Sequence, residues 1–137
     1  MIKRMLKKMG GISTYRKGSK RLLEVIREKR RKAKREEEEK GRMEKKGVIY
    51  RIQCSDCEMC YVGETGKKLR ERIKQYKDDV RLERDRNAIY KHIRDTGHLV
   101  DWSEVKVLGQ EGRRTVRKWK EARFIEVVGE KVMNWIL

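Results

Sequence analysis

Several side chains that bind metal ions stand in the second half of this 137-residue chain. Cys54 and Cys57 form a Cys-x2-Cys pair, and His92 and His98 follow later. Two thiolates and two imidazoles are a common ligand set of a closed, four-coordinate structural zinc site. The gap between Cys57 and His92 is 34 residues, far longer than in an ordinary zinc finger, so spacing alone supports zinc only weakly.

The three cysteines favour thiol or metal chemistry over a disulfide. Cys54, Cys57 and Cys60 lie within seven residues and cannot all pair with one another, and we expect no secretion because the N-terminus lacks an apolar signal region. Cys60 is the spare thiol, either displacing Cys57 as a ligand or remaining free beside Tyr61. Taken by itself, His92 would be interpreted as an ordinary core or surface histidine.

Glu121 is the most informative acidic residue. On a helix, Phe124, Ile125 and Val128 would follow three, four and seven positions later on the same face. An unpartnered carboxylate in such an apolar stripe costs several kcal/mol or is neutralised. It therefore needs a cation, either a divalent metal ion or a neighbouring arginine such as Arg117, which would make it an ordinary structural salt bridge.

The positive charge of the chain is large and uneven. The formal net charge is +17 and the isoelectric point about 10.0, which predicts a polyanionic partner, most often nucleic acid. Residues 1–46 contribute +12 (19 Lys and Arg against 7 Glu), and the remaining residues +5 (20 against 15). No apolar run approaches the roughly 20 residues that span a bilayer, so we expect no membrane contact.

Residues 1–45 are expected to form a basic, charged arm, and residues 46–137 a folded domain. Leu22, Leu23 and Ile26 supply one turn of apolar contact, after which charged residues follow without an apolar stripe. This pattern is typical of a solvated linker, partly helical or disordered. A cluster of basic residues also suggests nuclear import or phosphate binding, at Arg30, Arg31, Lys32, Lys34 and Arg35.

The folded region is predicted to be a small α/β domain with a short, mostly antiparallel three-stranded sheet flanked by helices. A hairpin turn holds Cys54 and Cys57, Thr65 caps the first helix, and Gly97 ends the second. The apolar positions expected to face inward on these helices are Leu69, Ile73, Tyr76, Val80, Ile89 and Ile93. The elements, in chain order, are strands at 48–52 and 61–63, helices reaching Val80 and covering about 85–96, a strand at 105–108 and a helix at about 113–128.

Two short motifs carry a family resemblance. Gly47-Val48-Ile49-Tyr50 is followed, eleven residues after its tyrosine, by Tyr61-Val62-Gly63. This pair resembles the signature of the GIY-YIG nucleases, and the similarity continues through Glu64-Thr65-Gly66 to Leu69 and Arg72. The resemblance covers nearly all of residues 46–137.

The version that the chain resembles most stands at the C-terminus of Penelope-like retroelement polyproteins. There, two cysteines separate the two halves of the signature, a Tyr-(Ile/Val)-Gly-Glu-Thr-Gly run leads into an arginine helix, and two histidines precede an acidic residue and a tryptophan. The corresponding residues here are Cys54, Cys57, His92, His98, Asp101 and Trp102. The resemblance makes a structural zinc site at the cysteines and histidines our preferred interpretation, tying the hairpin turn to the second helix.

The resemblance implies a metal-dependent endonuclease that nicks DNA. Cutting a phosphodiester requires a nucleophilic water, a cation facing the developing charge, and a metal ion. By the family's pattern, Tyr50 orients or deprotonates the water, Tyr61 supports the site, Arg72 stabilises the scissile phosphate and Glu121 ligates Mg²⁺.

Some positions leave the catalytic interpretation incomplete. Tyr76 stands where the family often has histidine, so its part in handling the proton stays open. Without the flanking glycines, the two strand tyrosines would be interpreted as ordinary packing, and Arg72 as one surface arginine among many. Asn134 matches a late asparagine of the family.

Two other functions are weighed against the nuclease. The first is a catalytically inactive, zinc-stabilised DNA-binding module, which plasmid cleavage would distinguish. The second is a basic RNA-binding protein of the ribosomal kind, which leaves the motifs after Gly47 unexplained.

The resemblance also bears on origin and location. In the related retroelements such a nick primes reverse transcription, and only this likeness suggests a nuclear location. The chain has no room for the polymerase, so we expect a fragment, a decayed copy or a stand-alone module. The arm would add salt-dependent phosphate contacts to DNA or retroelement RNA without reading sequence. No motif encodes the target or the oligomeric state.

Overall fold

The computed structural model describes the backbone of residues 12–136 and the side chains of residues 20–134. The chain divides into two compact units, Met1–Glu38 and Glu39–Leu137. The first consists, where described, of helix α2 (Ile12–Met43), which runs on into the second unit. Its arginines and lysines from 30 to 35 are exposed, as are Leu22 and Leu23. The basic arm is therefore helical from Ile12 onward, and residues 1–11 lie outside the described part.

The second unit contains one open antiparallel sheet. Strand β1 (Lys46–Gln53) lies in the centre, between β2 (Cys60–Lys68) and β3 (Lys106–Gln110). Both neighbours pair with β1 in the antiparallel direction. Loop 54–59 joins the first two strands, so the hairpin turn contains Cys54 and Cys57 as predicted.

Strand β2 is longer than the sequence predicted, and Thr65 does not cap a helix. The ladder with β1 continues past Gly63, pairing Thr65 with Val48 and Lys68 with Lys46. Thr65 is buried within the strand, and α3 begins only at Leu69, without a side-chain cap. The long central strand offers backbone partners throughout this segment, and a β-branched threonine suits a strand as well as a cap.

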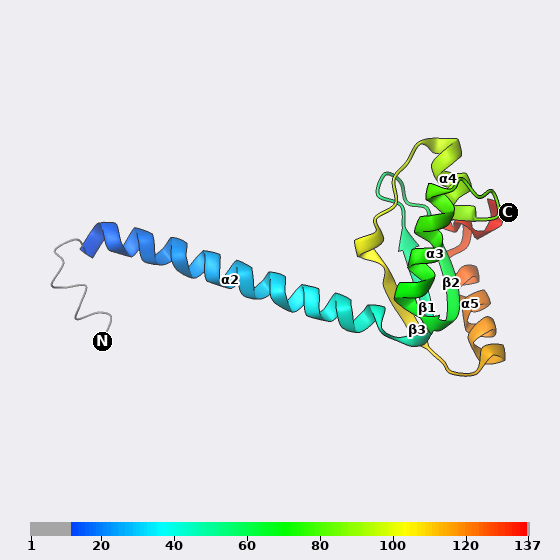
Figure 1. Cartoon of the computed structure of the whole chain (residues 1–137), viewed down its shortest axis with the longest axis horizontal. Helices are drawn as coiled ribbons and strands as arrows, with labels where there is room; N and C mark the ends of the chain where they lie inside the picture. The colour runs from blue at the N-terminus through cyan, green and yellow to red at the C-terminus, as the bar shows by residue number, and fades with distance from the viewer. Residues whose placement is uncertain (1–11, 137) are drawn as a thin grey trace. The chain divides into compact units, whose positions relative to one another are not determined.

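Helices cover both faces of the sheet (Figure 1). The three are α3 (Leu69–Arg81), α4 (Ala88–Thr96) and α5 (Arg114–Val128). The α4 helix begins later than predicted because Asn87 serves as its cap, its side-chain oxygen accepting from Ile89 N at 2.9 Å. Gly97 ends α4 in a left-handed conformation, as predicted. Short 3₁₀ turns cover Trp102–Glu104, Gly129–Lys131 and Met133–Ile136.

Alternating side chains of β1 define two apolar clusters. Val48, Tyr50 and Ile52 pack with buried residues of α3 and α4, whereas Ile49 packs with Val62 and partly buried residues of α5. On α3 and α4, the side chains of Leu69, Ile73, Tyr76 and Ile89 are buried as predicted, and those of Val80 and Ile93 are partly buried. The predicted α/β architecture is confirmed. Within the described residues, no helix has the length and hydropathy to cross a membrane.

Candidate functional site

Three tyrosines converge where β1, β2 and α3 meet. The hydroxyl groups of Tyr50 and Tyr76 are 2.8 Å apart and hydrogen bonded. The rings of Tyr61 and Tyr76 contact edge to face, with centroids 5.5 Å apart. Tyr50 and Tyr61, from the two paired strands, therefore lie in one cluster, and Tyr76 joins them from the helix.

Gly63 allows this convergence. It lies directly opposite Tyr50 in the ladder. A Cβ atom at position 63 would lie 2.5 Å from the Tyr50 hydroxyl oxygen and 2.9 Å from a ring carbon of Tyr61. Backbone and aromatic rings therefore approach so closely that only glycine fits.

Arg72 reaches the tyrosines from the first turn of α3. Its Nε donates to the Tyr50 hydroxyl at 3.4 Å, and its guanidinium carbon lies 4.8 Å from the centre of the Tyr76 ring. Burial alone would lower the pKa of Arg72, but the neighbouring Tyr76 and Tyr50 raise it, so the guanidinium stays charged.

The tyrosine hydroxyls are held in their protonated form. Burial raises the pKa of Tyr50, Tyr61 and Tyr76 well above that of free tyrosine. Each hydroxyl is therefore a hydrogen-bond donor near neutral pH. Tyr50 is completely buried, whereas Tyr61 keeps part of its surface exposed.

A cleft of about 510 Å³ opens beside this cluster. It runs between the tyrosines, the outer side of α3 and the loop that enters α4. Tyr50 lies behind its wall rather than on its surface. The lining residues are Tyr61, Arg72, Gln75, Tyr76, Asp78, Asp79, Arg84, Arg86, Asn87 and Ala88.

Glu121 lies on α5, which contacts the edge strand β2. Its side chain is only 17% exposed, and its nearest cation is Lys118 Nζ at 3.5 Å. Burial raises the pKa of the Glu121 carboxyl, and Glu64 raises it further, against the opposing effects of Lys118 and Arg72. The carboxylate thus lies in a partly dry position where a stronger cation would be favourable.

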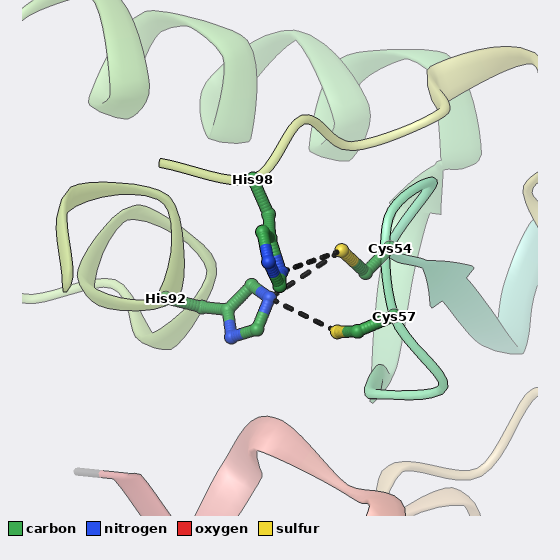
Figure 2. Close-up of side chains that lie close together, drawn as sticks. All are labelled: Cys54, Cys57, His92 and His98. Carbon is green, nitrogen blue, oxygen red and sulfur yellow. Dashed lines mark hydrogen bonds between the residues drawn. The ribbon is translucent and has the colours of Figure 1, made fainter. Parts of the chain in front are cut away.

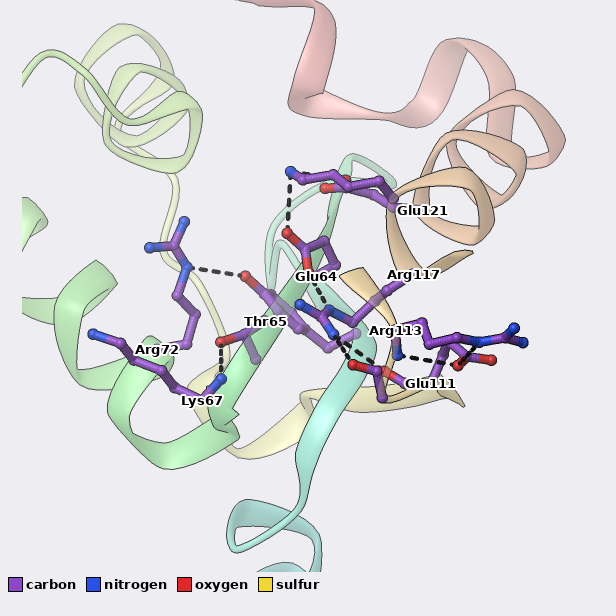
Figure 3. Close-up of polar contacts among 11 residues, drawn as sticks. Glu64, Thr65, Lys67, Arg72, Glu111, Arg113, Arg117 and Glu121 are labelled. Carbon is purple, nitrogen blue, oxygen red and sulfur yellow. Dashed lines mark hydrogen bonds and ion pairs between the residues drawn. The ribbon is translucent and has the colours of Figure 1, made fainter. Parts of the chain in front are cut away.

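Arg117 was one of the cations expected to pair with Glu121, but in the structure it pairs with another carboxylate. Its Nε donates to a carboxylate oxygen of Glu64, forming a buried ion pair (Figure 3). Its Nη1 also donates to the carbonyl oxygens of Glu111 and Gly112, at 3.2 and 3.1 Å. Helical spacing places Arg117 one turn before Glu121. Glu64, which pairs with Ile49 in the β1–β2 ladder, lies beside that same turn and forms the ion pair with the Arg117 guanidinium.

Sequence reasoning did not assign a role to Glu64. Its side chain is nearly buried, and it also accepts Lys118 Nζ at 3.1 Å, so Lys118 bridges Glu64 and Glu121. Burial would raise the pKa of the Glu64 carboxyl, but the hydrogen bonds from Arg117 and Lys118 lower it below its ordinary value. The only indication in the sequence that Glu64 has a role was its position directly after Gly63 of the signature motif.

Residues 46–127 match the family model of the GIY-YIG catalytic domain. The chain belongs to the GIY-YIG family. Membership implies a nuclease of the GIY-YIG type, with DNA as its substrate. No curated protein and no solved structure matches the chain. The matched range of this GIY-YIG domain contains all five predicted catalytic residues: Tyr50, Tyr61, Arg72, Tyr76 and Glu121.

The predicted zinc ligands also come together in the GIY-YIG domain. One ligand atom from each of Cys54, Cys57, His92 and His98 lies within 4.8 Å of the others (Figure 2). The Cys54 sulfur is 3.4 Å from His92 Nε2 and 3.7 Å from His98 Nδ1, and the Cys57 sulfur is 3.5 Å from His92 Nε2.

These distances suit a tetrahedral metal centre. With Zn–S bonds of about 2.3 Å and Zn–N bonds of about 2.0–2.1 Å, the sulfur–nitrogen edges of a tetrahedron are roughly 3.6 Å long. Burial, assisted by His98, lowers the pKa of His92 and favours the neutral imidazole that binds metal. The donor set therefore fits zinc.

The backbone around the cluster holds its ligands in place. Cys54 N donates to Met59 O at 3.0 Å, closing the loop that carries both cysteines. Leu99 N donates to an Asp56 carboxylate oxygen at 2.7 Å, which links that loop to the histidine segment. Cys60 is fully buried and lies outside the cluster, so it does not displace Cys57 as a ligand.

Asn134 makes contact with the outer edge of β2. Its amide donates to Val62 O at 2.7 Å, and its carbonyl accepts from Val62 N at 3.1 Å. These two bonds continue the ladder beside Tyr61 and Gly63. Asn134 therefore holds the signature strand in position, from outside the matched range.

Proposed function

We propose that this GIY-YIG domain is a DNA endonuclease that nicks one phosphodiester bond with the help of Mg²⁺. The observation that carries the proposal is the Tyr50–Tyr76–Arg72 cluster, in which the charged Arg72 and the protonated Tyr76 line a cleft and Tyr50 bonds both from behind its wall. Charge of this kind, fixed in advance at a partly desolvated surface, stabilises the negative transition state of phosphodiester cleavage.

Arg72, Tyr61 and Tyr50 each have a proposed part. Arg72 contacts the scissile phosphate through the donors that remain after Nε bonds Tyr50 and Nη1 bonds Gln75 Oε1 at 2.9 Å. Tyr61, which lines the cleft, orients the attacking water through its hydroxyl. Tyr50 is buried, so it acts as a positioning residue for Tyr76 and Arg72 rather than as a base.

Glu121 is the proposed magnesium ligand. Its partly buried carboxylate fits a cation that accepts oxygen ligands and usually keeps several waters. Mg²⁺ bound there would stabilise charge on the phosphate oxygens. Without Mg²⁺, the Glu121 carboxylate pairs with Lys118 Nζ at 3.5 Å, and this ion pair would separate when Mg²⁺ binds.

The cysteine–histidine cluster is proposed to bind zinc structurally. All four ligands come from protein, which leaves no coordination position for substrate. Its ligands join loop 54–59 to α4 and the segment that follows it.

Origin, location and domain limits stand as further proposals. The motif residues that resemble Penelope-like retroelements support derivation from such an element, and with it a nuclear location. We propose residues 1–45 as a basic arm, in contact with DNA or retroelement RNA, and residues 46–137 as the nuclease domain.

Plasmid nicking tests the proposed function. The parent, Glu121→Ala and Arg72→Ala are compared with Arg123→Ala, which removes an exposed arginine paired with Glu126. We expect nicking only with Mg²⁺, its loss in the first two variants, and parent-like nicking in the control, with zinc content equal throughout. A zinc-loaded parent that binds DNA but never nicks it would indicate the inactive binding module instead.

A further inference from the structure

Two arginines outside the catalytic cluster also line the cleft. Arg84 and Arg86 belong to the loop between α3 and α4, and both line the cleft with Asn87. Arg72 and Gln75 line it from α3. The cleft therefore runs from the proposed scissile-phosphate position to a second basic wall.

A buried carboxylate fixes this loop. Asp79, on the last turn of α3, is only 9% exposed. One of its oxygens accepts Arg84 Nη1 at 3.1 Å and Arg86 Nη2 at 3.2 Å, and Arg84 N donates to Asp79 O at 2.9 Å. Burial alone would raise the pKa of Asp79, but the two arginines lower it below its ordinary value. Asp79 is therefore an ionised anchor for both guanidinium groups.

Both arginines keep donors for a ligand. A guanidinium has five N–H donors, and Asp79 takes one from each. The side chains of Arg84 and Arg86 are 46% and 70% exposed, so their remaining donors reach solvent. Asn87 lines the same part of the cleft, but its Nδ2 is buried and helps to lower the pKa of Asp79, so it is not counted as a donor for the ligand.

The charge of the lining favours an anion. Three arginines face two aspartates, and both aspartates are already paired, Asp79 with the loop arginines and Asp78 with Arg81 at 3.3 Å. The cleft also ends at the start of α4, where a helix dipole is positive. Forked guanidinium groups of this kind match phosphate oxygens.

We infer that Arg84 and Arg86, held by Asp79, bind backbone phosphates of the DNA strand next to the phosphate that Arg72 contacts. This inference rests on the proposed function and adds the path of the strand. The arginines are binding residues, and the chemistry stays at Arg72, Tyr61 and Glu121. Contacts to phosphates position the strand without reading its sequence.

DNA binding measured without Mg²⁺ tests the inference. A fluorescent duplex is titrated at several salt concentrations with the zinc-loaded parent and with Arg84→Ala/Arg86→Ala. The matched control is Arg113→Ala/Arg123→Ala, which removes the same charge from exposed arginines that pair with Glu111 and Glu126. Zinc content and Tm are recorded for each protein.

We expect the cleft variant to bind DNA roughly tenfold more weakly and its salt slope to fall by about 2, since each lost phosphate contact lowers the slope by about 0.9. The control should keep the parent's slope. If the double variant loses zinc, Arg86→Ala alone, the more exposed position, should lower the slope by about 1.

Equal losses in the cleft variant and the control, or an unchanged slope in the cleft variant, would overturn the inference. If the parent nicks DNA but the cleft variant and the control bind DNA with the same affinity, the nuclease activity is supported. The inferred path of the strand past Arg84 and Arg86 is then wrong. If DNA binding by the parent depends on Arg84 and Arg86 but the parent never nicks DNA, the binding site would stand and the proposed nuclease activity would be wrong.

Discussion

At the scale of single residues, the signature glycine and the tyrosines are explained by one contact. Gly63 lets the rings of Tyr50 and Tyr61 lie against the backbone of β2, and this places the Tyr50 hydroxyl beside Tyr76 and Arg72. Tyr76 contributes a hydroxyl that is hydrogen bonded to the Tyr50 hydroxyl at 2.8 Å.

Gly63→Ala should disrupt this cluster. The added methyl group would overlap the Tyr50 hydroxyl, and relieving such an overlap typically costs about 1–3 kcal/mol. We expect a lower free energy of unfolding in a denaturant titration and a nicking rate reduced at least tenfold. The control is Gly112→Ala, since no atom lies within 4 Å of a Cβ atom there. Parent-like nicking by Gly63→Ala would contradict the account of the glycine.

Glu121→Gln should stabilise the protein in the absence of Mg²⁺. Burial raises the folded-state pKa of Glu121 above its ordinary value of 4.5, so ionisation opposes folding. The parent therefore loses stability, relative to the variant, as the pH rises from below 4.5 through the folded-state pKa. At pH 7 we expect a Tm a few degrees higher for Glu121→Gln, with the difference shrinking toward pH 4.

The same measurement with Mg²⁺ separates the metal ligand from a salt bridge. Added Mg²⁺ should raise the Tm of the parent and leave that of Glu121→Gln unchanged. The exposed Glu126→Gln serves as the control and should respond to Mg²⁺ like the parent. A Glu121→Gln variant that is less stable at pH 7 would mean that the ion pair with Lys118 dominates.

At the scale of elements, local signals predicted the helices better than the end of β2. Helical periodicity found the buried positions of α3, and Gly97 marked the end of α4. The prediction that Thr65 caps a helix was wrong. The preference of threonine for helix caps competes here with strand pairing to Val48, and that pairing depends on the whole sheet. The candidate site residues could be predicted from the sequence motifs and from the family resemblance that these motifs carry. The Arg117–Glu64 pair could not, since it joins residues 53 positions apart through the packing of α5 on β2.

Zinc bound at the proposed cysteine–histidine site should hold loop 54–59 to α4. Structural zinc contributes about 10–16 kcal/mol in small zinc-finger peptides, so chelation should lower the Tm sharply and reversibly. We expect one zinc ion per chain by atomic absorption, and its loss in Cys57→Ser. Cys60→Ala is the control and should retain zinc, because Cys60 lies outside the cluster. A parent whose Tm is insensitive to chelators would contradict a structural zinc site.

At the scale of the whole molecule, much of the positive charge lies outside the catalytic unit. Residues 1–38 carry 15 Lys and Arg against 5 Glu, a net charge of +10 out of +17. The described side chains of this segment are almost all exposed. This first unit is therefore suited to sequence-independent phosphate contacts, while the proposed chemistry lies in the second unit.

Deleting residues 1–38 should separate these two contributions. We expect weaker DNA binding and a shallower salt slope, because basic contacts are lost. Zinc content and the nicking rate at saturating DNA should be unchanged. A shortened chain that loses zinc or nicking at saturating DNA would show that the arm belongs to the catalytic fold.

The central claim is that the tyrosine–arginine cluster and Glu121 carry out metal-dependent nicking. The most direct test is the single-turnover nicking rate of saturated plasmid as a function of Mg²⁺ concentration, for the parent and Glu121→Gln at equal zinc content. We predict a parent rate that rises from zero and saturates, and no nicking by the variant although it binds DNA equally well. Nicking by Glu121→Gln at the parent's rate, or by the parent without a divalent metal ion, would contradict it.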